Sequence, residues 1–307
     1  MTFLENVDKT KLQKITLIVI SALVLAALAL LLVIIIMSIT PKTPGLSDGI
    51  KNLKDYTVTD TDINTGSLIL ADDDHHYTLD KNSVELVNCQ AHRNAYLLQN
   101  GVTQAEIDDR TGDQAARFRK LRYMPYADMY LQKDAMVAAH EMLIAATDAN
   151  MDKYGPITID TAYGLTTHLK GHSQEIGTAL TIYLSDENSD TGAYKALPQG
   201  HRDWFDKNAY KYGFIESFED GYRYVGAPHA KLIKDNDDIS TLADYIAFLK
   251  DKTGYDKTVR VKVDGVEYAV YYVACEEGQT IKVPANNTYT ISGTNEGGVI
   301  ITVKLSK

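Results

Sequence analysis

The chain has 307 residues, of which 45% are hydrophobic, and it carries a formal net charge of −10 at pH 7. An acidic balance of this size argues against binding to nucleic acid and against docking on anionic lipid through a basic face. Only two cysteines occur, Cys89 and Cys275, which excludes a disulfide scaffold. Two unrelated buried thiols are the favoured interpretation, and a single bridge between them is the alternative.

A stretch of 26 residues without a charge covers positions 15–40. At about 1.5 Å per residue, a helix of this length exceeds the ~30 Å hydrocarbon core of a bilayer. Signal peptides usually have apolar regions of only about 7–15 residues, and no small-residue cleavage site follows this stretch. The sequence therefore predicts a short cytoplasmic tail over residues 1–14 and one uncleaved transmembrane helix over residues 15–40. The positive-inside rule is nearly neutral here, and the basic tail favours a C-terminal part outside the cytoplasm.

Residues 41–62 are rich in Pro, Gly, Lys and Asp and are predicted to form a linker. A short apolar strand that runs into an acidic turn is predicted for residues 66–77 ("GSLILADDDHHY"). The clearest soluble helix covers residues 131–151, where Met136, His140 and Leu143 recur at helical spacing.

Strands are predicted next over residues 157–160 and 177–184, and helices over residues 201–214 and 239–254. Because helices and strands mix without strict alternation, the predicted class is α+β. From residue 257 onward the sequence consists of β-branched and aromatic runs divided by turn signals such as Asp264-Gly265. The predicted domains are therefore an α+β domain over residues 63–256 and an antiparallel all-β module over residues 257–307.

One histidine on the predicted helix invites a metal interpretation. His140-Glu141 matches the start of the zinc-binding helix His-Glu-x-x-His, but Ile144 occupies the position of the second histidine. Since the rest of that helix face is apolar, a core histidine is the better prediction.

The remaining histidine pairs are weaker candidates. His168 and His172 have the spacing of a metal pair, yet the polar run around them favours a loop. The doublet His75-His76 follows three aspartates and is predicted to be a solvated cluster. The sequence contains no Gly-x-Ser-x-Gly, Walker or Rossmann pattern, so spacing alone identifies no active site.

Longer stretches carry a family resemblance. Residues 204–215 ("WFDKNAYKYGFI") and 222–230 ("YRYVGAPHA") closely resemble the VanY-type D-alanyl-D-alanine carboxypeptidases, zinc metallopeptidases that trim the peptidoglycan stem peptide. Residues 66–77, "ITIDTAYG" and "GHSQEIGTALTIYL" fit further segments of that family in the same order. The resemblance implies mixed helices around a small antiparallel sheet and a cell membrane of the Gram-positive type.

The resemblance also implies a set of metal ligands, which this chain lacks. Such enzymes hold zinc with two histidines and an aspartate and leave one position for the attacking water. The first histidine falls on Gln174, or on Glu175 if the segment is one residue short. The aspartate falls on Thr181 and the second histidine on Gly221.

Two further roles in such enzymes belong to a glutamate that takes the proton of the water and an arginine that pairs with the substrate carboxylate. The glutamate position falls on Phe218, unless Glu216 or Glu219 takes its place. The arginine position falls on Gly164. The substitutions predict neither catalytic residues nor a zinc cofactor.

The leading hypothesis is a membrane-anchored, extracytoplasmic pseudopeptidase. Its partners would be the membrane, through one N-terminal helix, and either peptidoglycan peptide or an envelope protein. The predicted binding residues of the remnant cleft are Tyr163, His172, Glu175, Tyr222 and Arg223.

Two alternatives remain open. One is an active zinc D,D-carboxypeptidase with ligands re-sited among His168, His172, His201 and either Glu175 or Glu219. The other is a purely structural envelope protein whose cleft is filled.

Overall fold

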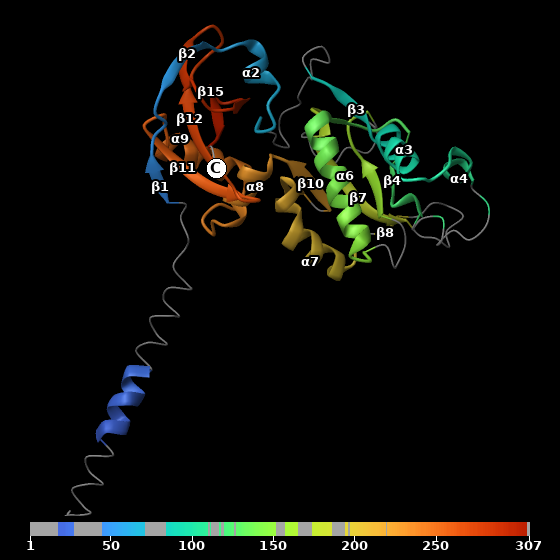
Figure 1. The fold of residues 1–307 in the computed structure, drawn as a ribbon, viewed down its shortest axis with the longest axis horizontal. Helices are drawn as coiled ribbons and strands as arrows, with labels where there is room; N and C mark the ends of the chain where they lie inside the picture. The colour runs from blue at the N-terminus through green and yellow to red at the C-terminus, as the bar shows by residue number, and fades with distance from the viewer. Residues whose placement is uncertain are drawn as a thin grey trace, which may run out of the picture. The chain divides into compact units, whose positions relative to one another are not determined.

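The computed structural model describes residues 18–27, 45–70, 84–109, 111, 117, 120–125, 127–151, 157–164, 174–185, 194–195, 197–218 and 220–305. The chain divides into two units, Met1–Thr43 and Pro44–Lys307. In the first unit, residues 18–27 form a helix, drawn in dark blue in Figure 1. The rest of the predicted transmembrane helix lies outside the described residues. Within the described ranges, no helix combines the length and hydropathy needed to cross a membrane.

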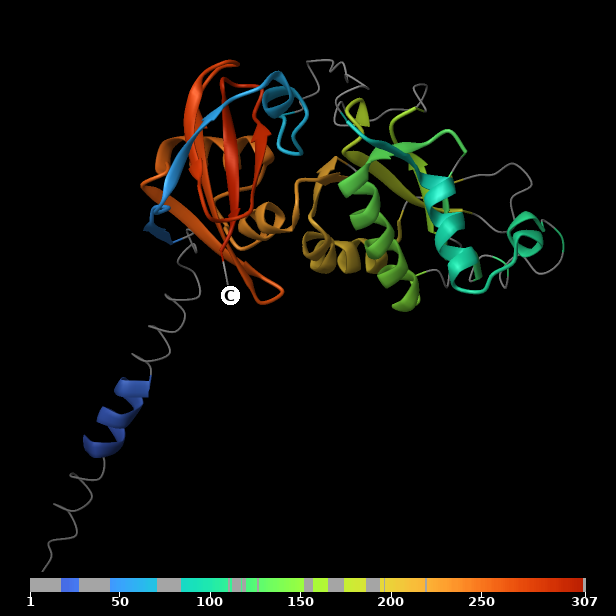
Figure 2. The same cartoon turned by 45° about the horizontal axis from the view of Figure 1, so that its top comes forward.

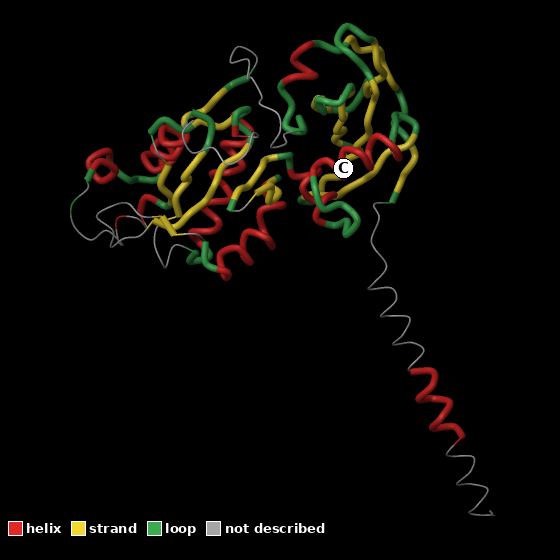
Figure 3. Tube along the Cα trace, turned by 180° about the vertical axis from the view of Figure 1, so that it is seen from behind, coloured by secondary structure: helices red, strands yellow, loops and turns green. Residues whose placement is uncertain are grey.

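A six-stranded sheet forms the first half of the larger unit. Its order is β4-β6-β7-β10-β9, with β8 beside β7, and every pair except β4–β6 is antiparallel. The strands are β4 (Tyr123–Pro125), β6 (Ile157–Thr161), β7 (Ala179–Ser185), β8 (Tyr194–Lys195), β9 (Phe214–Phe218) and β10 (Gly221–Tyr224). A short antiparallel pair, β3 (Leu86–Asn88) and β5 (Tyr130–Gln132), is separate from this sheet. The sheet confirms the predicted α+β class, and Figure 3 shows the same strands from behind.

Helices α6 (Lys133–Asp148) and α7 (Gln199–Asn208) pack on one face of this sheet. Figure 1 shows α6, in green, beside the strands of this sheet. Met136, Leu143 and Ala146 of α6 are fully buried against strand residues, as the predicted apolar stripe requires. A 3₁₀ turn, η3 (Ala209–Tyr212), follows α7 and ends at Gly213 with φ +84°, which confirms the predicted helix and its Tyr-Gly stop.

The remaining helices are α2 (Asp60–Asn64), α3 (Cys89–Gln99), α4 (Gln104–Asp108), α8 (Ala227–Lys234) and α9 (Leu242–Lys252). Helix α9 confirms the helix predicted over residues 239–254. It begins with a capping box between Thr241 and Asp244, and Tyr245, Ile246 and Leu249 are buried beneath it.

A five-stranded antiparallel sheet of order β1-β11-β12-β15-β14 forms the second half of the unit. Its strands are β1 (Leu46–Asp48), β11 (Lys257–Val263), β12 (Val266–Ala274), β14 (Tyr289–Gly293) and β15 (Gly298–Lys304). A two-stranded sheet pairs β13 (Thr280–Pro284) with β2 (Leu53–Thr57). The predicted turn at Asp264-Gly265 joins β11 to β12, and both residues have positive φ, as such hairpin turns require.

Two predicted segments differ from the structure. Residues 41–62 were expected to form a linker, but β1, β2 and α2 lie there, and β1 and β2 pair with β11 and β13. Figures 1 and 2 show blue β2 against the orange and red strands. The strand expected over residues 66–77 is not formed in its described part, where residues 66–70 make a turn with Leu68 buried. The pairing of β1 and β2 could not be predicted from local patterns, because their main-chain partners lie about 200 residues away in the chain.

Candidate functional site

The positions that correspond to the family's metal ligands meet on the face of the six-stranded sheet opposite α6 and α7. Leu180 and Ile182 of β7 belong to the core beneath the helices, so Thr181 between them points to the other face. Thr181 is the register partner of Gly221 in β10 and of Thr161 in β6. Strand pairing therefore brings the positions of the aspartate and the second histidine beside each other.

Neutral hydrogen bonds connect these side chains. The Thr161 N–H donates to Thr181 Oγ1 at 2.9 Å, and the two threonine hydroxyls share a hydrogen bond of 2.6 Å. The Gln174 amide donates to Thr161 Oγ1. All three residues are buried. The strand register shifts between Ile159 and Thr161, which turns the Thr161 N–H away from the regular ladder. The Thr181 hydroxyl accepts the hydrogen bond of this N–H instead.

The second histidine position is closed by an aromatic ring. Phe218 of β9 is the register partner of Gly221, and a Cβ added at Gly221 would overlap three carbons of the Phe218 ring. The ring at the family's general-base position therefore fills the space beside the family's ligand position. Any side chain at Gly221 would have to displace this ring.

The available groups do not fit zinc. Gln174 offers a neutral amide, Thr181 a hydroxyl and Gly221 no side chain, whereas zinc sites use imidazole, thiolate and carboxylate. Across the described ranges, no group of three or more His, Cys, Asp or Glu side chains is placed to hold a metal ion. We therefore assign no reaction step to a metal at these positions.

Glu216 does not replace the missing general base. It is the register partner of Tyr222, and both residues line a cavity on the helix-covered face of the sheet. A register shift between Gly221 and Tyr222 separates the Tyr222–Glu216 pair from the Gly221–Phe218 pair. The carboxylate is thus on the wrong side of the sheet to serve Thr181 and Gly221. Glu219, the other candidate for this role, lies outside the described residues.

The substrate-arginine position is closed by main chain. Gly164 has φ +104°, and a Cβ there would overlap the carbonyl oxygen of Asp128. The adjacent Tyr163 forms an isolated bridge with Tyr130, whose N–H donates to the Tyr163 carbonyl at 2.8 Å. An arginine side chain cannot be accommodated here without moving residues 128–130.

The predicted binding residues do not form a common cleft in the described structure. Arg223 is 1% exposed, and its guanidinium donates to the carbonyl oxygen of Ile69. Tyr222, also 1% exposed, points to the other face and packs against Phe205 with ring centroids 5.1 Å apart. Glu175 is half-buried, and His172 lies outside the described residues. Arg223 is therefore a packing residue here, whereas Tyr222 packs against α7 and lines the cavity that it shares with Glu216.

The re-sited ligand set is described only in part. His201 is 2% exposed on α7, and its Nε2 forms a hydrogen bond of 2.5 Å with the carbonyl of Met151. His168 and His172 lie outside the described residues, as do His75 and His76. The re-sited zinc site therefore stays a prediction.

Two sequence interpretations are confirmed away from this face. His140 is buried, its Nδ1 lies 2.9 Å from the Tyr123 hydroxyl, and burial lowers its pKa to about 4, as expected of a core histidine. Cys89 and Cys275 are both free and buried. Burial raises the pKa of Cys89 to about 12, so this thiol is not a nucleophile at neutral pH.

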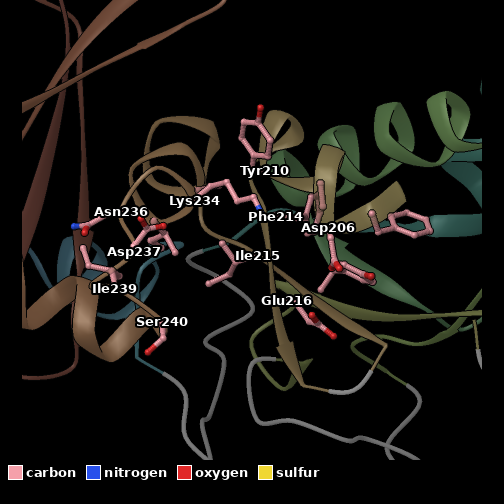
Figure 4. Close-up of a pocket in the computed structure, with 15 residues that line it drawn as sticks. Asp206, Tyr210, Phe214, Ile215, Glu216, Lys234, Asn236, Asp237, Ile239 and Ser240 are labelled. Carbon is pink, nitrogen blue, oxygen red and sulfur yellow. The ribbon is translucent and has the colours of Figure 1, made fainter. Parts of the chain in front are cut away.

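A cavity of about 310 Å³ was not predicted from the sequence. It is open to solvent on one side and is lined by α7, η3, β9, β10, α8 and residues 236–240, with Asp206, Glu216 and Lys234 among both apolar and polar side chains (Figure 4). Burial raises the pKa of Glu216, and the nearby charge of Asp206 adds to this shift. Asp206 lies within the stretch that matched the family, but its helix position had no pattern that pointed to a cavity.

Comparison with known proteins agrees with the resemblance. No family model matches the chain. A D-alanyl-D-alanine carboxypeptidase of Enterococcus faecium is 33% identical over 153 residues, which cover 46% of this chain and 44% of that protein. The chain thus spans less than half the length of this curated relative.

A solved structure supports the fold. The crystal structure of the vancomycin resistance D,D-dipeptidase VanXYg in complex with a D-Ala-D-Ala phosphinate analog matches with a TM-score of 0.57 and 18% identity. The match covers 83% of this chain and 100% of that one. Together the two matches confirm the similarity to D-alanyl-D-alanine peptidases that the sequence indicated.

Proposed function

We propose that this protein is a catalytically inactive, membrane-anchored relative of the D-alanyl-D-alanine carboxypeptidases that acts by binding in the cell envelope. The observation that carries the proposal is the set of neutral, hydrogen-bonded groups at the family's metal positions. Hydrogen bonds link Gln174, Thr161 and Thr181, and the Phe218 ring covers Gly221.

Loss of hydrolysis follows from what these groups can do. An amide and a hydroxyl that already share hydrogen bonds compete poorly with water for Zn²⁺, which needs three strong donors. Phe218 cannot accept a proton, and proton transfer by a positioned base is worth roughly 10²–10⁴-fold in rate. The two deficits act at the same place, so repair of one would not restore turnover.

The proposed location rests on the uncharged stretch over residues 15–40, which is long enough to span a bilayer. The basic residues ahead of it favour an N-terminus in the cytoplasm and a larger unit in the extracytoplasmic space. Such a placement would put the peptidase-like fold beside the cell wall.

We favour an envelope protein over cell-wall peptide as the partner. The structural relative is described in complex with a D-Ala-D-Ala analog. A similar ligand would need a cation for its terminal carboxylate, and the family's arginine position here is Gly164, packed against the carbonyl of Asp128. The same ligand would find Arg223 occupied by the Ile69 carbonyl.

Metal and product analysis of the purified full chain tests the proposal. We expect no stoichiometric zinc by mass spectrometry and no D-alanine release from a stem pentapeptide, with the Enterococcus faecium relative as the active control. Stoichiometric zinc together with turnover would overturn the proposal and support the re-sited ligand set. In that case His172→Ala should abolish both zinc binding and turnover.

A further inference from the structure

The edge strand β14 offers unpaired main-chain groups. β14 is the last strand of the five-stranded sheet, and among the described strands it pairs with β15 alone. The Lys304 N–H donates to the Thr288 carbonyl at 2.8 Å, which makes Thr288 and Lys304 a hydrogen-bonded pair. By the alternation of an antiparallel ladder, the N–H and C=O of Tyr289 and Ile291 then point away from β15, toward the open edge.

These outward groups have no hydrogen-bond partner in the part of the chain that the structure describes. The far end of the same edge is closed, because the Leu68 N–H donates to Ser292 Oγ at 2.9 Å and Gly293 packs against the main chain of Ile63. The open part is therefore confined to residues 289–291. An open edge of this kind is a template for another strand.

A groove of about 690 Å³ is lined by this open edge and by the sheet face beside it. Residues 288–292 line it together with Tyr268, Thr302 and Lys304 of the neighbouring strands, and the first turns of α6 and α8 with residues 65–67 and 84–85 line the rest. The positive ends of both helix dipoles border the groove. At α6 the Asp134 carboxylate offsets the dipole, whereas the N-cap of α8 is Gly226, which has no side chain that could do so.

The charges of the groove favour an acidic occupant. Glu85 is neutralised by Lys133 at 2.9 Å, and Asp134 lies in the first turn of α6, where it complements the helix dipole. Lys304 also lines the groove and has no ion pair among the described residues. An incoming carboxylate near Lys304 would thus meet an uncompensated positive charge.

We propose that this groove binds an extended segment of a partner protein, which adds as a strand to β14 and places an acidic side chain near Lys304. Tyr289 and Ile291 stand two residues apart, about 6–7 Å along the strand, and a polypeptide of L-residues presents its own N–H and C=O groups at that spacing. The assignment deepens the binding role proposed above and rests on it. The cell-wall peptide and a second copy of this chain are the competing occupants.

The test uses Ile291→Pro and Ile291→Ala in the full chain. Proline removes the outward N–H of residue 291 without removing a bond to β15, which edge strands tolerate. Alanine removes the same apolar side chain but keeps the N–H, so it is the matched control. Dodecapeptides selected from a phage-displayed library on the wild-type chain are then measured against all three proteins by calorimetry.

We expect acidic peptides of alternating pattern that bind wild type and Ile291→Ala similarly and bind Ile291→Pro about tenfold more weakly. Hydrogen exchange provides a second readout that needs no variant. In the free protein the amides of Tyr289 and Ile291 should exchange faster than those of Thr290 and Ser292, and the bound peptide should protect them.

Several results would overturn the proposal. Peptides that bind wild type and Ile291→Pro equally would place the site elsewhere. Protection of Tyr289 and Ile291 that grows with protein concentration, together with dimers in sedimentation, would identify a second copy as the occupant. Protection by a stem pentapeptide ending in D-Ala-D-Ala would identify cell-wall peptide. Zinc and turnover assays are separate from all of these readouts, so failure of the strand proposal is distinguishable from failure of the pseudopeptidase proposal.

Discussion

At the residue scale, the altered positions fit one another. Thr181 accepts a hydrogen bond from the Thr161 N–H, and the Gln174 amide donates one to the Thr161 hydroxyl. The Phe218 ring fills the space beside Gly221, which has no side chain. A single substitution back to a family ligand would place a charged or basic group among buried neutral partners. This arrangement of neutral groups is therefore a packed state in its own right.

Gly164 provides a direct test of how tightly the arginine position is closed. Gly164→Ala should lower the free energy of unfolding by about 2–5 kcal/mol, because the methyl group adds an overlap with the Asp128 carbonyl to the cost of a positive φ. Gly101→Ala is the matched control, since Gly101 also has a positive φ (+85°) but no atom of the described residues lies within 4 Å of the added Cβ. It should cost only about 1–2 kcal/mol in urea unfolding. Equal losses in the two variants would show that the position is open.

Phe218 and Gly221 should be energetically coupled. Gly221→Ala should cost about 1–3 kcal/mol through overpacking against the ring, and Phe218→Ala should remove that obstacle. The double variant should therefore lose about 1 kcal/mol less than the sum of the single losses. The measurement is a double-mutant cycle by urea unfolding. Additivity within about 0.5 kcal/mol would mean that the ring does not fill the ligand position.

At the element scale, local sequence patterns predicted the features that depend on residues close in the chain. The apolar stripe of α6, the Tyr-Gly stop after η3 and the turn at Asp264-Gly265 depend on neighbours within a few residues, and all three are confirmed. β1 and β2 were missed because their partners, β11 and β13, lie some 200 residues away and pairing of short strands depends on main-chain groups that every sequence shares.

At the candidate site, too, some features could be predicted from the sequence and others depend on distant parts of the chain. The resemblance matched Gln174, Thr181 and Gly221 to ligand positions one by one. The structure brings these positions together through the Thr181–Gly221 register and the hydrogen bonds of Thr161. The resemblance did not predict that Thr161 completes the hydrogen bonds, since that role arises from a register shift in β6. It also did not predict that Arg223 is covered, because Ile69 comes from a distant turn.

His229 links three elements and should make their stability depend on pH. It is buried on α8, with Nδ1 2.8 Å from the Tyr245 hydroxyl of α9 and Nε2 2.8 Å from Thr302 Oγ1 of β15. Burial lowers its pKa from 6.5 to about 3, so the folded chain holds it neutral where the unfolded chain protonates it. The stabilisation is fully present above pH 6.5 and is lost as the pH falls toward the folded pKa.

The expected slope is up to about 1.4 kcal/mol per pH unit between pH 6.5 and about 4. Urea unfolding over this range should show a slope smaller by about that amount in His229→Gln, whose amide does not titrate. The comparison between variants removes the contribution of the other titrating groups. An unchanged slope in His229→Gln would show that His229 is protonated in the folded chain.

At the scale of the whole molecule, the N-terminal and C-terminal segments of the larger unit belong to one β structure. Val58 and Ile281 share a core with Val299, Ile301 and Val303 of the C-terminal strands. The chain division at Thr43 and Pro44 agrees with this arrangement, because it leaves β1 and β2 with the strands that they pair with. The unit therefore cannot be cut at the end of the predicted linker without removing part of its sheets.

Two truncated chains test this boundary. A chain that begins at Pro44 retains β1 and β2 and should unfold in one cooperative transition. A chain that begins at Thr59 loses both strands and the buried Val58, which exposes the edges of β11 and β13 and removes apolar packing worth about 2–3 kcal/mol for Val58 alone. We expect this shorter chain to melt at least about 10 °C lower or to aggregate, as measured by scanning calorimetry and light scattering. If both chains melt together, the contribution of β1 and β2 to the sheets is negligible, and residues 44–58 act as the linker that their composition indicates.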